Sequence, residues 1–239
     1  MLKGILKSLL NVTFPSTCLA CRTPLDNTSI DSLLCYNCWK AIKRNTPPLC
    51  AICGRKIRGA YQKVCPNCQR QNFSFDRAFS PCAYEGVIRE LIHKFKYQNK
   101  DYLKLLLSRL LIEFIQQYRL TLDFFDLVIP IPLHGVRLKE REFNQAEILA
   151  RKIADNFSLP LSPSNLWRKH HRQAQIELDT NQRWKNIKGC FTLRDPAEVR
   201  GKKILLIDDV LTTGATCSEA ASVLKTAGAI NIWVLTLAN

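Results

Sequence analysis

The sequence of 239 residues contains neither a long apolar run nor a glycine loop of the Walker type. No stretch approaches the roughly eighteen apolar residues that a membrane-spanning helix needs. The first residues do not form a secretory leader, because Lys3 and Lys7 interrupt the apolar positions and no small-residue cleavage site follows. The motif G-x-x-x-x-G-K-[ST] does not occur, which excludes a Walker-type nucleotide loop. These absences predict a cytoplasmic protein without a transmembrane segment.

Acidic residues are also scarce. The chain has 20 Asp and Glu against 35 Lys and Arg, which gives a formal charge of +15. The excess is uneven, since residues 1–75 contain eleven basic and two acidic residues, or +9, and the remainder contributes +6. Such a field favours polyanions such as nucleic acid. A basic surface that is merely well solvated explains the same numbers, so both interpretations stay open.

Cysteine, in contrast, is abundant, with eleven residues. Eight of them form four C-x-x-C pairs, in which two thiolates can chelate one metal ion and two pairs complete a tetrahedron. The spacing predicts two structural zinc sites, most simply from consecutive pairs, and without a leader disulfides are disfavoured. Redox dithiols are the alternative. The predicted ligands are Cys18, Cys21, Cys35, Cys38, Cys50, Cys53, Cys65 and Cys68.

The chain divides into three parts. Residues 1–14 have the periodicity of a short amphipathic helix, which either packs on the body or touches a membrane surface. Residues 15–72 contain the cysteine pairs and predict a double zinc ribbon whose folding energy comes from the metal. Residues 73–239 are long enough for one α/β core.

The third part alternates helical and strand patterns. Helices are expected over 87–96, 102–118, 145–157 and 218–227, and strands over 126–131, 204–207 and 230–237. This order predicts a mainly parallel sheet with helices on both faces, and ligands bind such sheets at the carboxyl edge.

The most informative segment follows the strand 204–207. Asp208 and Asp209 come at its end, and a loop of small and hydroxyl residues then opens a helix. Helix N-termini bind phosphate through free N–H groups, and Gly214 would let the backbone approach closely. Two carboxylates can accept hydrogen bonds from a ribose diol and help to hold magnesium through water. The segment therefore predicts a ribose-phosphate site.

These residues resemble the phosphoribosyl-pyrophosphate (PRPP) motif of type I phosphoribosyltransferases, and the whole chain resembles the ComF competence family. The resemblance implies a phosphoribosyltransferase-like α/β fold behind the zinc ribbons, binding of PRPP with magnesium, and a connection with DNA uptake during natural transformation. It also implies that the acid pair and the following loop contact PRPP. These residues are Asp208, Asp209, Thr212, Thr213, Gly214, Ala215 and Thr216.

A second part of the site is expected after the strand 126–131. The following loop, with His134 and Gly135, matches the family's pyrophosphate loop in position. Arg141 opens a segment similar to the family's R-G-F-N-Q signature, but Glu142 replaces the glycine and would be strained if that position needs a positive φ. Lys96 and Arg141 are interpreted either as pyrophosphate contacts or as solvated surface. Asp208, Asp209 and Arg141 are the catalytic candidates.

Three functions are compatible with this pattern. The first is an enzyme that transfers a pentosyl group from PRPP and releases pyrophosphate, although Thr212 stands where enzymes of 6-oxopurine salvage commonly have an acid. The second is a non-catalytic adaptor for single-stranded DNA, in which Arg55, Lys56 and Arg58 would bind phosphates from one surface. The ribose-phosphate site would then sense a ligand or bind the end of a nucleic acid. The third is a scaffold for proteins of the competence machinery. The sequence leaves the acceptor, and turnover itself, open.

Overall fold

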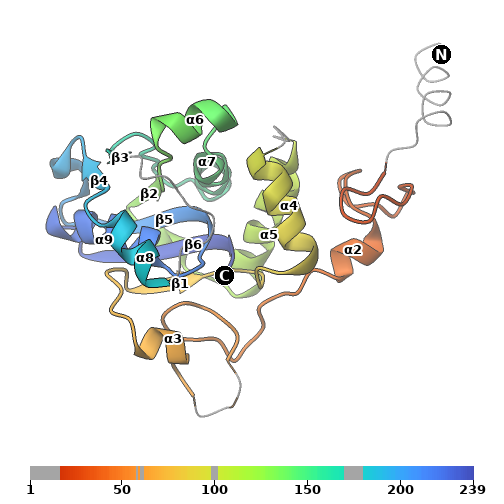
Figure 1. Cartoon of the computed structure of the whole chain (residues 1–239), viewed down its shortest axis with the longest axis horizontal. Coiled ribbons are helices and arrows are strands. Elements are labelled where there is room, and N and C mark those ends of the chain that lie inside the picture. The colour runs from red at the N-terminus through yellow and green to blue at the C-terminus, as the bar shows by residue number, and fades with distance from the viewer. Residues whose placement is uncertain (1–16, 58, 60–61, 98–101, 170–179) are drawn as a thin grey trace.

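The computed structural model describes residues 17–239 apart from residues 58, 60–61, 98–101 and 170–179 (Figure 1). The helix predicted over residues 1–14 lies outside the described residues. In the described part of the chain, no helix combines the length and the apolar content needed to cross a bilayer.

A four-stranded sheet forms the centre of the larger part, and all its neighbouring strands are parallel. Its spatial order is β1 (Arg77–Phe79), β6 (Asn231–Ala238), β5 (Lys203–Val210) and β2 (Leu127–Pro130). The parallel sheet is as predicted. The strand β1 was not expected, because three residues are too few to show a period, and it forms by pairing with β6.

Helices cover both faces of this sheet, as predicted. The helices α4 (Gly86–Tyr97), α5 (Leu103–Gln117) and α7 (Gln145–Phe157) share one buried cluster, and α9 (Ala215–Thr226) belongs to the other. The alternation of side chains along β5 explains the division. Leu205 and Ile207 join the first cluster, whereas Ile204 and Leu206 join the second.

Shorter elements complete the part of the chain that the structure describes (Figure 1). The strands β3 (Leu166–Arg168) and β4 (Phe191–Leu193) form an antiparallel pair. The other short elements are α6 (Gly135–Arg141), α8 (Thr180–Ile187) and two 3₁₀ turns, η1 (Leu122–Phe124) and η2 (Pro196–Val199).

The two cysteine-rich segments lie on different parts of this body. The first ribbon (residues 18–40) contains α2 (Tyr36–Lys40), and the second ribbon (residues 50–69) contains α3 (Pro66–Gln69). Figure 1 shows α2 at one end of the long axis, whereas α3 lies below β1. Cysteines of the first ribbon join the buried cluster of α4, α5 and α7, and those of the second join the cluster of α9.

Candidate functional site

The eight paired cysteines form two groups of four. Within each group the Sγ atoms lie within 4.8 Å of one another, and consecutive pairs group together as predicted. The distance from Cys21 Sγ to Cys35 Sγ is 3.7 Å, as is that from Cys53 Sγ to Cys65 Sγ. In a tetrahedral site with Zn–S bonds of about 2.3 Å, sulfur atoms lie about 3.8 Å apart. Both groups therefore fit zinc.

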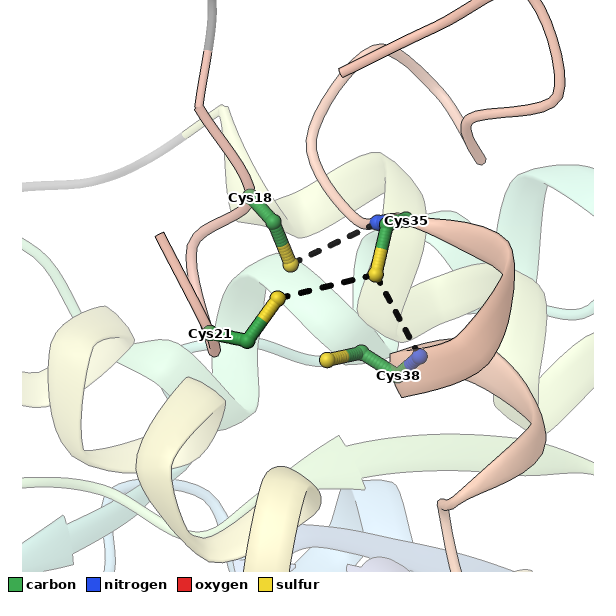
Figure 2. Close-up of side chains that lie close together, drawn as sticks. All are labelled: Cys18, Cys21, Cys35 and Cys38. Atoms are coloured by element: carbon green, nitrogen blue, oxygen red, sulfur yellow. Dashed lines mark hydrogen bonds between the residues drawn. The ribbon is translucent and has the colours of Figure 1, made fainter. Parts of the chain in front are cut away.

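In the first ribbon the four side chains point toward a common centre (Figure 2). The backbone N–H of Cys35 donates to Cys18 Sγ at 3.4 Å, and that of Cys38 donates to Cys35 Sγ at 3.5 Å. Hydrogen bonds from the Thr23 hydroxyl and backbone lower the pKa of Cys21 to about 6. Such donors stabilise thiolates, the form that binds metal.

The second ribbon has the same arrangement in a more buried setting, since all four of its cysteines are buried. Burial favours the thiol of Cys50, but backbone N–H groups of Cys53 and Cys65 outweigh it and lower its pKa to about 7. Burial dominates at Cys53 and raises its pKa to about 12. A cation between the sulfurs would offset this cost of burying charge.

A cavity of about 230 Å³ lies at the carboxyl edge of the sheet. Six of the predicted site residues line it: Lys96, Arg141, Asp208, Asp209, Thr212 and Thr216. A smaller cavity of about 20 Å³ is formed by residues 210–217, which include the predicted Thr213, Gly214 and Ala215. The structure thus brings the acid pair and the loop before α9 together, and it adds two cations to them.

The acid pair lies within the last residues of β5, which runs to Val210 rather than ending at residue 207. Asp209 is buried and forms an ion pair with Lys96, with 2.8 Å between Oδ2 and Nζ. Burial and the Asp209 charge raise the pKa of Asp208 to about 7, although Lys96 and the Asp209 N–H oppose this. One of the two acids therefore holds its proton up to near neutral pH.

Lys96 and Arg141 approach the cavity from α4 and α6. Burial alone would lower the pKa of Lys96, but the charges of Asp209 and Asp208 outweigh it and raise the pKa. Arg141 donates to Tyr97 Oη at 3.1 Å and to the Gln145 side chain at 3.3 Å. Both cations are therefore held at the cavity instead of lying on a solvated surface.

The predicted pyrophosphate loop is the start of a helix. His134 is the N-cap of α6, where Nδ1 accepts a hydrogen bond from Val136 N at 3.3 Å, and Gly135 is the first helical residue. Neither residue lines the larger cavity. At the other end of α6, Glu142 has a φ of 65°, so the position that the family fills with glycine does require a left-handed backbone here.

Arg168 is a cavity residue that no sequence pattern indicated. It reaches the larger cavity from β3, and its Nε is buried with no hydrogen-bond partner among the described residues. Burial lowers its pKa, which shows that nearby carboxylates do not fully compensate its charge. No local pattern could have identified it, because β3 has three residues and forms by pairing with β4.

Cys217 lies directly behind the acid pair. It is buried, and its Sγ donates to Asp208 Oδ2 at 3.7 Å. Burial and the Asp208 charge raise its pKa, so the side chain is a thiol. Its place at the start of α9 does not activate it.

Two of the three basic residues that were expected to form one DNA-binding surface, Arg55 and Lys56, lie within the described residues. Arg55 donates hydrogen bonds to the carbonyl oxygens of Leu211, at 3.0 Å, and of Thr212. Lys56 is exposed and donates to Thr46 Oγ1 at 3.3 Å. Arg58 lies outside the described residues. Arg55 is half-buried and contacts the loop that follows the acid pair, and DNA binding by these residues stays a prediction.

Two segments of the chain match known protein families. Residues 9–69 match a double zinc ribbon domain, and residues 143–239 match a phosphoribosyl transferase domain. The fold and the cysteine groups thus define a double zinc ribbon joined to a phosphoribosyltransferase-like domain. The chain is 31% identical to competence protein F of Haemophilus influenzae, over 93% of this chain and 97% of that protein. It belongs to the competence protein F family.

Other relatives carry related names. The chain is 29% identical to DNA utilization protein YhgH of Escherichia coli, over 94% of this chain and 98% of that protein. It is 27% identical to competence protein ComFC of Bacillus subtilis, over 83% and 80%. These matches extend over both domains, so the arrangement of ribbons and α/β domain is shared by the family.

Solved structures give weaker similarities. An allosteric regulatory enzyme of purine biosynthesis matches 59% of this chain and 25% of its own, with a TM-score of 0.35 and 17% identity. A purine phosphoribosyltransferase from Pyrococcus horikoshii matches 58% and 71%, with a TM-score of 0.32 and 19% identity. The parallel sheet and the family match establish the fold.

Proposed function

We propose that the chain binds PRPP, or a closely related ribose phosphate, together with magnesium at the larger cavity. The observation that carries this proposal is the geometry around β5. The acid pair lines the same cavity as Thr212 and Thr216, and a small hollow lies in the adjoining loop before α9. A phosphate in the hollow and a diol at the carboxylates match the two ends of a phosphoribosyl group.

Different residues around the cavity bind different parts of the ligand. The loop and the first turn of α9 bind the 5′-phosphate through N–H and hydroxyl groups. Asp208 and Asp209 accept hydrogen bonds from the ribose hydroxyls, and their oxygens suit magnesium that retains its waters. Lys96, which pairs with Asp209, and Arg141, which lines the same cavity, would balance pyrophosphate.

The reaction that such a site supports is transfer of the pentosyl group to a nucleophile, with release of pyrophosphate. Positive charge develops on the ribose ring as the bond to pyrophosphate breaks, and the acid pair holds the ring while it develops. Binding of the 5′-phosphate at a distance from the reacting carbon fixes the orientation. Magnesium would neutralise the leaving group.

Thermal unfolding with PRPP and magnesium tests this proposal. A ligand at about a hundred times its Kd stabilises the native state by about 2.7 kcal/mol, which raises Tm by several degrees. The double variant Asp208→Asn with Asp209→Asn should lose this shift. The exposed Asp123→Asn is the matched control and should keep it. Equal shifts in all three proteins would refute the site, and pyrophosphate release across candidate acceptors then tests turnover.

A second proposed role, in handling single-stranded DNA, is favoured by the surface of the first ribbon. The Tyr36 ring is 46% exposed, and Lys40 Nζ lies 4.5 Å from its centroid. Lys43 is exposed close by in the chain. Aromatic rings next to cations bind bases and phosphates together. The names of the relatives connect such a role to competence and DNA utilization. A cytoplasmic site of action, with competence-machinery proteins as partners, completes the proposal.

A further inference from the structure

The second ribbon touches the loop that precedes α9. This β5–α9 loop consists of residues 211–214. Arg55, two positions after the ligand Cys53, donates from Nη2 to the carbonyl oxygens of Leu211 and Thr212. The contact joins residues that are 156 positions apart in the chain. It connects a metal-binding segment directly to the backbone that is proposed to hold the 5′-phosphate.

The direction of these hydrogen bonds matters for anion binding. A peptide unit is planar and trans, so its C=O and N–H groups point in opposite directions. Arg55 binds the C=O side of the units Leu211–Thr212 and Thr212–Thr213. The N–H groups of Thr212 and Thr213 therefore point away from Arg55. A cation on the carbonyl oxygens also polarises these units, which strengthens their N–H groups as donors.

The chain segment that follows the second ribbon holds the same loop at a second point. A Cβ on Gly214 would lie 2.5 Å from the ring of Phe73, so the ring lies directly against this glycine. Ser74 N donates to Ser218 Oγ, in the first turns of α9, at 2.9 Å. The loop is thus fixed by Arg55 on its carbonyl side and by Phe73 at Gly214.

The position of Arg55 depends on the turn between the first two metal ligands. Cys50 N donates to Arg55 O at 2.7 Å, and Gly54 N donates to Cys50 O at 3.0 Å. A Cβ on Gly54 would lie 2.7 Å from Ala78 O in β1, so this turn packs closely on the sheet. Ala78 N and Asn239 Nδ2 bind the carbonyls of Ile52 and Cys53. Metal bound by Cys50 and Cys53 would hold this turn in place.

We propose that the second ribbon positions the β5–α9 loop, with Arg55 as the positioning residue, so that binding of a phosphate monoester depends on the metal at Cys50, Cys53, Cys65 and Cys68. The first ribbon, whose described contacts lie with α4 and α5, does not have this effect. Only the identity of the anion rests on the proposed function. The loop's conformation can be measured without a ligand.

Hydrogen exchange of the ligand-free protein tests the positioning itself. Arg55→Gln should accelerate exchange of the amides of Leu211 and Ala215, which donate to Ala238 O and Thr213 Oγ1, at least about fivefold, because the loop loses its anchor and opens locally. Exchange in α5 should not change. Arg55→Lys, which can still donate to one carbonyl, should restore most of the protection, and Lys56→Gln is the matched control with none of the effect. Unchanged exchange in Arg55→Gln would overturn the proposal.

Ligand binding provides a readout that a general loss of stability would not give. Arg55→Gln should weaken binding of ribose 5-phosphate about tenfold, the effect of one or two lost hydrogen bonds. Binding of magnesium pyrophosphate, which lacks the 5′-phosphate, should stay the same. Equal weakening of both ligands would overturn the specific role of Arg55. A wild-type protein that binds neither ligand would refute the proposed function, and the exchange experiment would still decide this inference.

Two matched cysteine variants, one in each ribbon, test the dependence on metal. Cys35 and Cys65 are the N-cap residues of α2 and α3 and occupy the same place in their ribbons. Cys65→Ser should accelerate exchange at Leu211 and Ala215, whereas Cys35→Ser should not, and metal analysis should find one zinc ion in each variant. Acceleration by both variants, or by neither, would contradict a role confined to the second ribbon.

Discussion

The two ribbons have the same ligands and different surroundings. Each has two C-x-x-C pairs, and in each the third cysteine begins a short helix. In the second ribbon all four cysteines are buried, whereas in the first Cys21 is exposed and Cys35 is half-buried. The first packs beside α4 and α5, and the second packs beneath β1 and beside the β5–α9 loop.

This difference separates what a metal motif determines from what it does not. The spacing of the cysteines determines the local fold, because two knuckles and one ion close a small unit without a large core. The role of the unit comes from the surface on which it packs. Arg55 of the second ribbon contacts the proposed ribose-phosphate site. Tyr36 and Lys40 of the first ribbon face solvent.

The largest expected effect is on the stability of the protein. It should differ between the two ribbons if their surroundings matter. Cys65→Ser should lower the free energy of unfolding by about 4 kcal/mol or more, because it removes metal from a site within a buried cluster. Cys35→Ser should cost roughly half as much, because its ribbon is more exposed. Denaturant unfolding with zinc analysis measures both, and equal losses would show that surroundings do not matter.

The next effect tests the contact of Phe73 with the loop. Gly214→Ala should destabilise the protein by about 2–4 kcal/mol, since a Cβ meets Phe73 at 2.5 Å and φ is 80°. Gly189→Ala is the matched control, because Gly189 also has a positive φ, of 72°, and no described atom lies within 4 Å of the added Cβ. It should cost only the backbone strain of about 1–2 kcal/mol. Similar costs from chemical denaturation would show that Phe73 does not restrain the loop.

Binding of single-stranded DNA should depend on the first ribbon more than on the second. Tyr36→Ala with Lys40→Gln should weaken binding of a labelled single-stranded oligonucleotide by about 1–3 kcal/mol through lost stacking. The slope of affinity against salt should fall by about 1 for the lost charge. Lys56→Gln on the second ribbon should leave stacking unaffected. Fluorescence anisotropy across a salt series decides this, and equal losses in the two variants would count against the first ribbon.

The last effect concerns the acid pair, which should respond to pH independently of the first ribbon. The pKa of Asp208 is raised to about 7, so between about pH 4 and 7 the native state keeps a proton that the unfolded chain releases. The stability contributed by this group therefore falls as pH rises through that range. Asp208→Asn should flatten the decline in urea unfolding, and Cys35→Ser should not. Parallel pH profiles for wild type and Asp208→Asn would contradict the raised pKa.

Local features of the fold could be predicted from the sequence. The helix over residues 145–157 was placed at its observed bounds, because its apolar period is regular and Asn144 caps it. The cysteine groups followed from spacing alone. The acid pair was identified by composition, yet β5 continues through it, because pairing with β6 extends to Val210 and Ala238. Local polarity could not reveal that pairing.

Long-range features of the site could not be predicted in this way. The ion pair of Lys96 with Asp209 and the contacts of Arg55 both join residues that are distant in the chain. Arg168 reaches the cavity only because β3 pairs with β4. In each case a single basic residue lacks any local pattern, and the sheet order decides which partner it meets. The family resemblance identified Lys96 and Arg141, while Arg55 and Arg168 required the structure.

The sheet order β1-β6-β5-β2 also has a consequence for the order in which the chain is assembled on the ribosome. The partners of Arg55 leave the ribosome 156 residues after it. At about 5–20 residues per second, this corresponds to about 8–30 s. During that interval β1 has no neighbouring strand, and the thiols of the second ribbon are exposed to the cell. The second ribbon must therefore obtain its zinc, or avoid oxidation, before the surface that later buries it has been made.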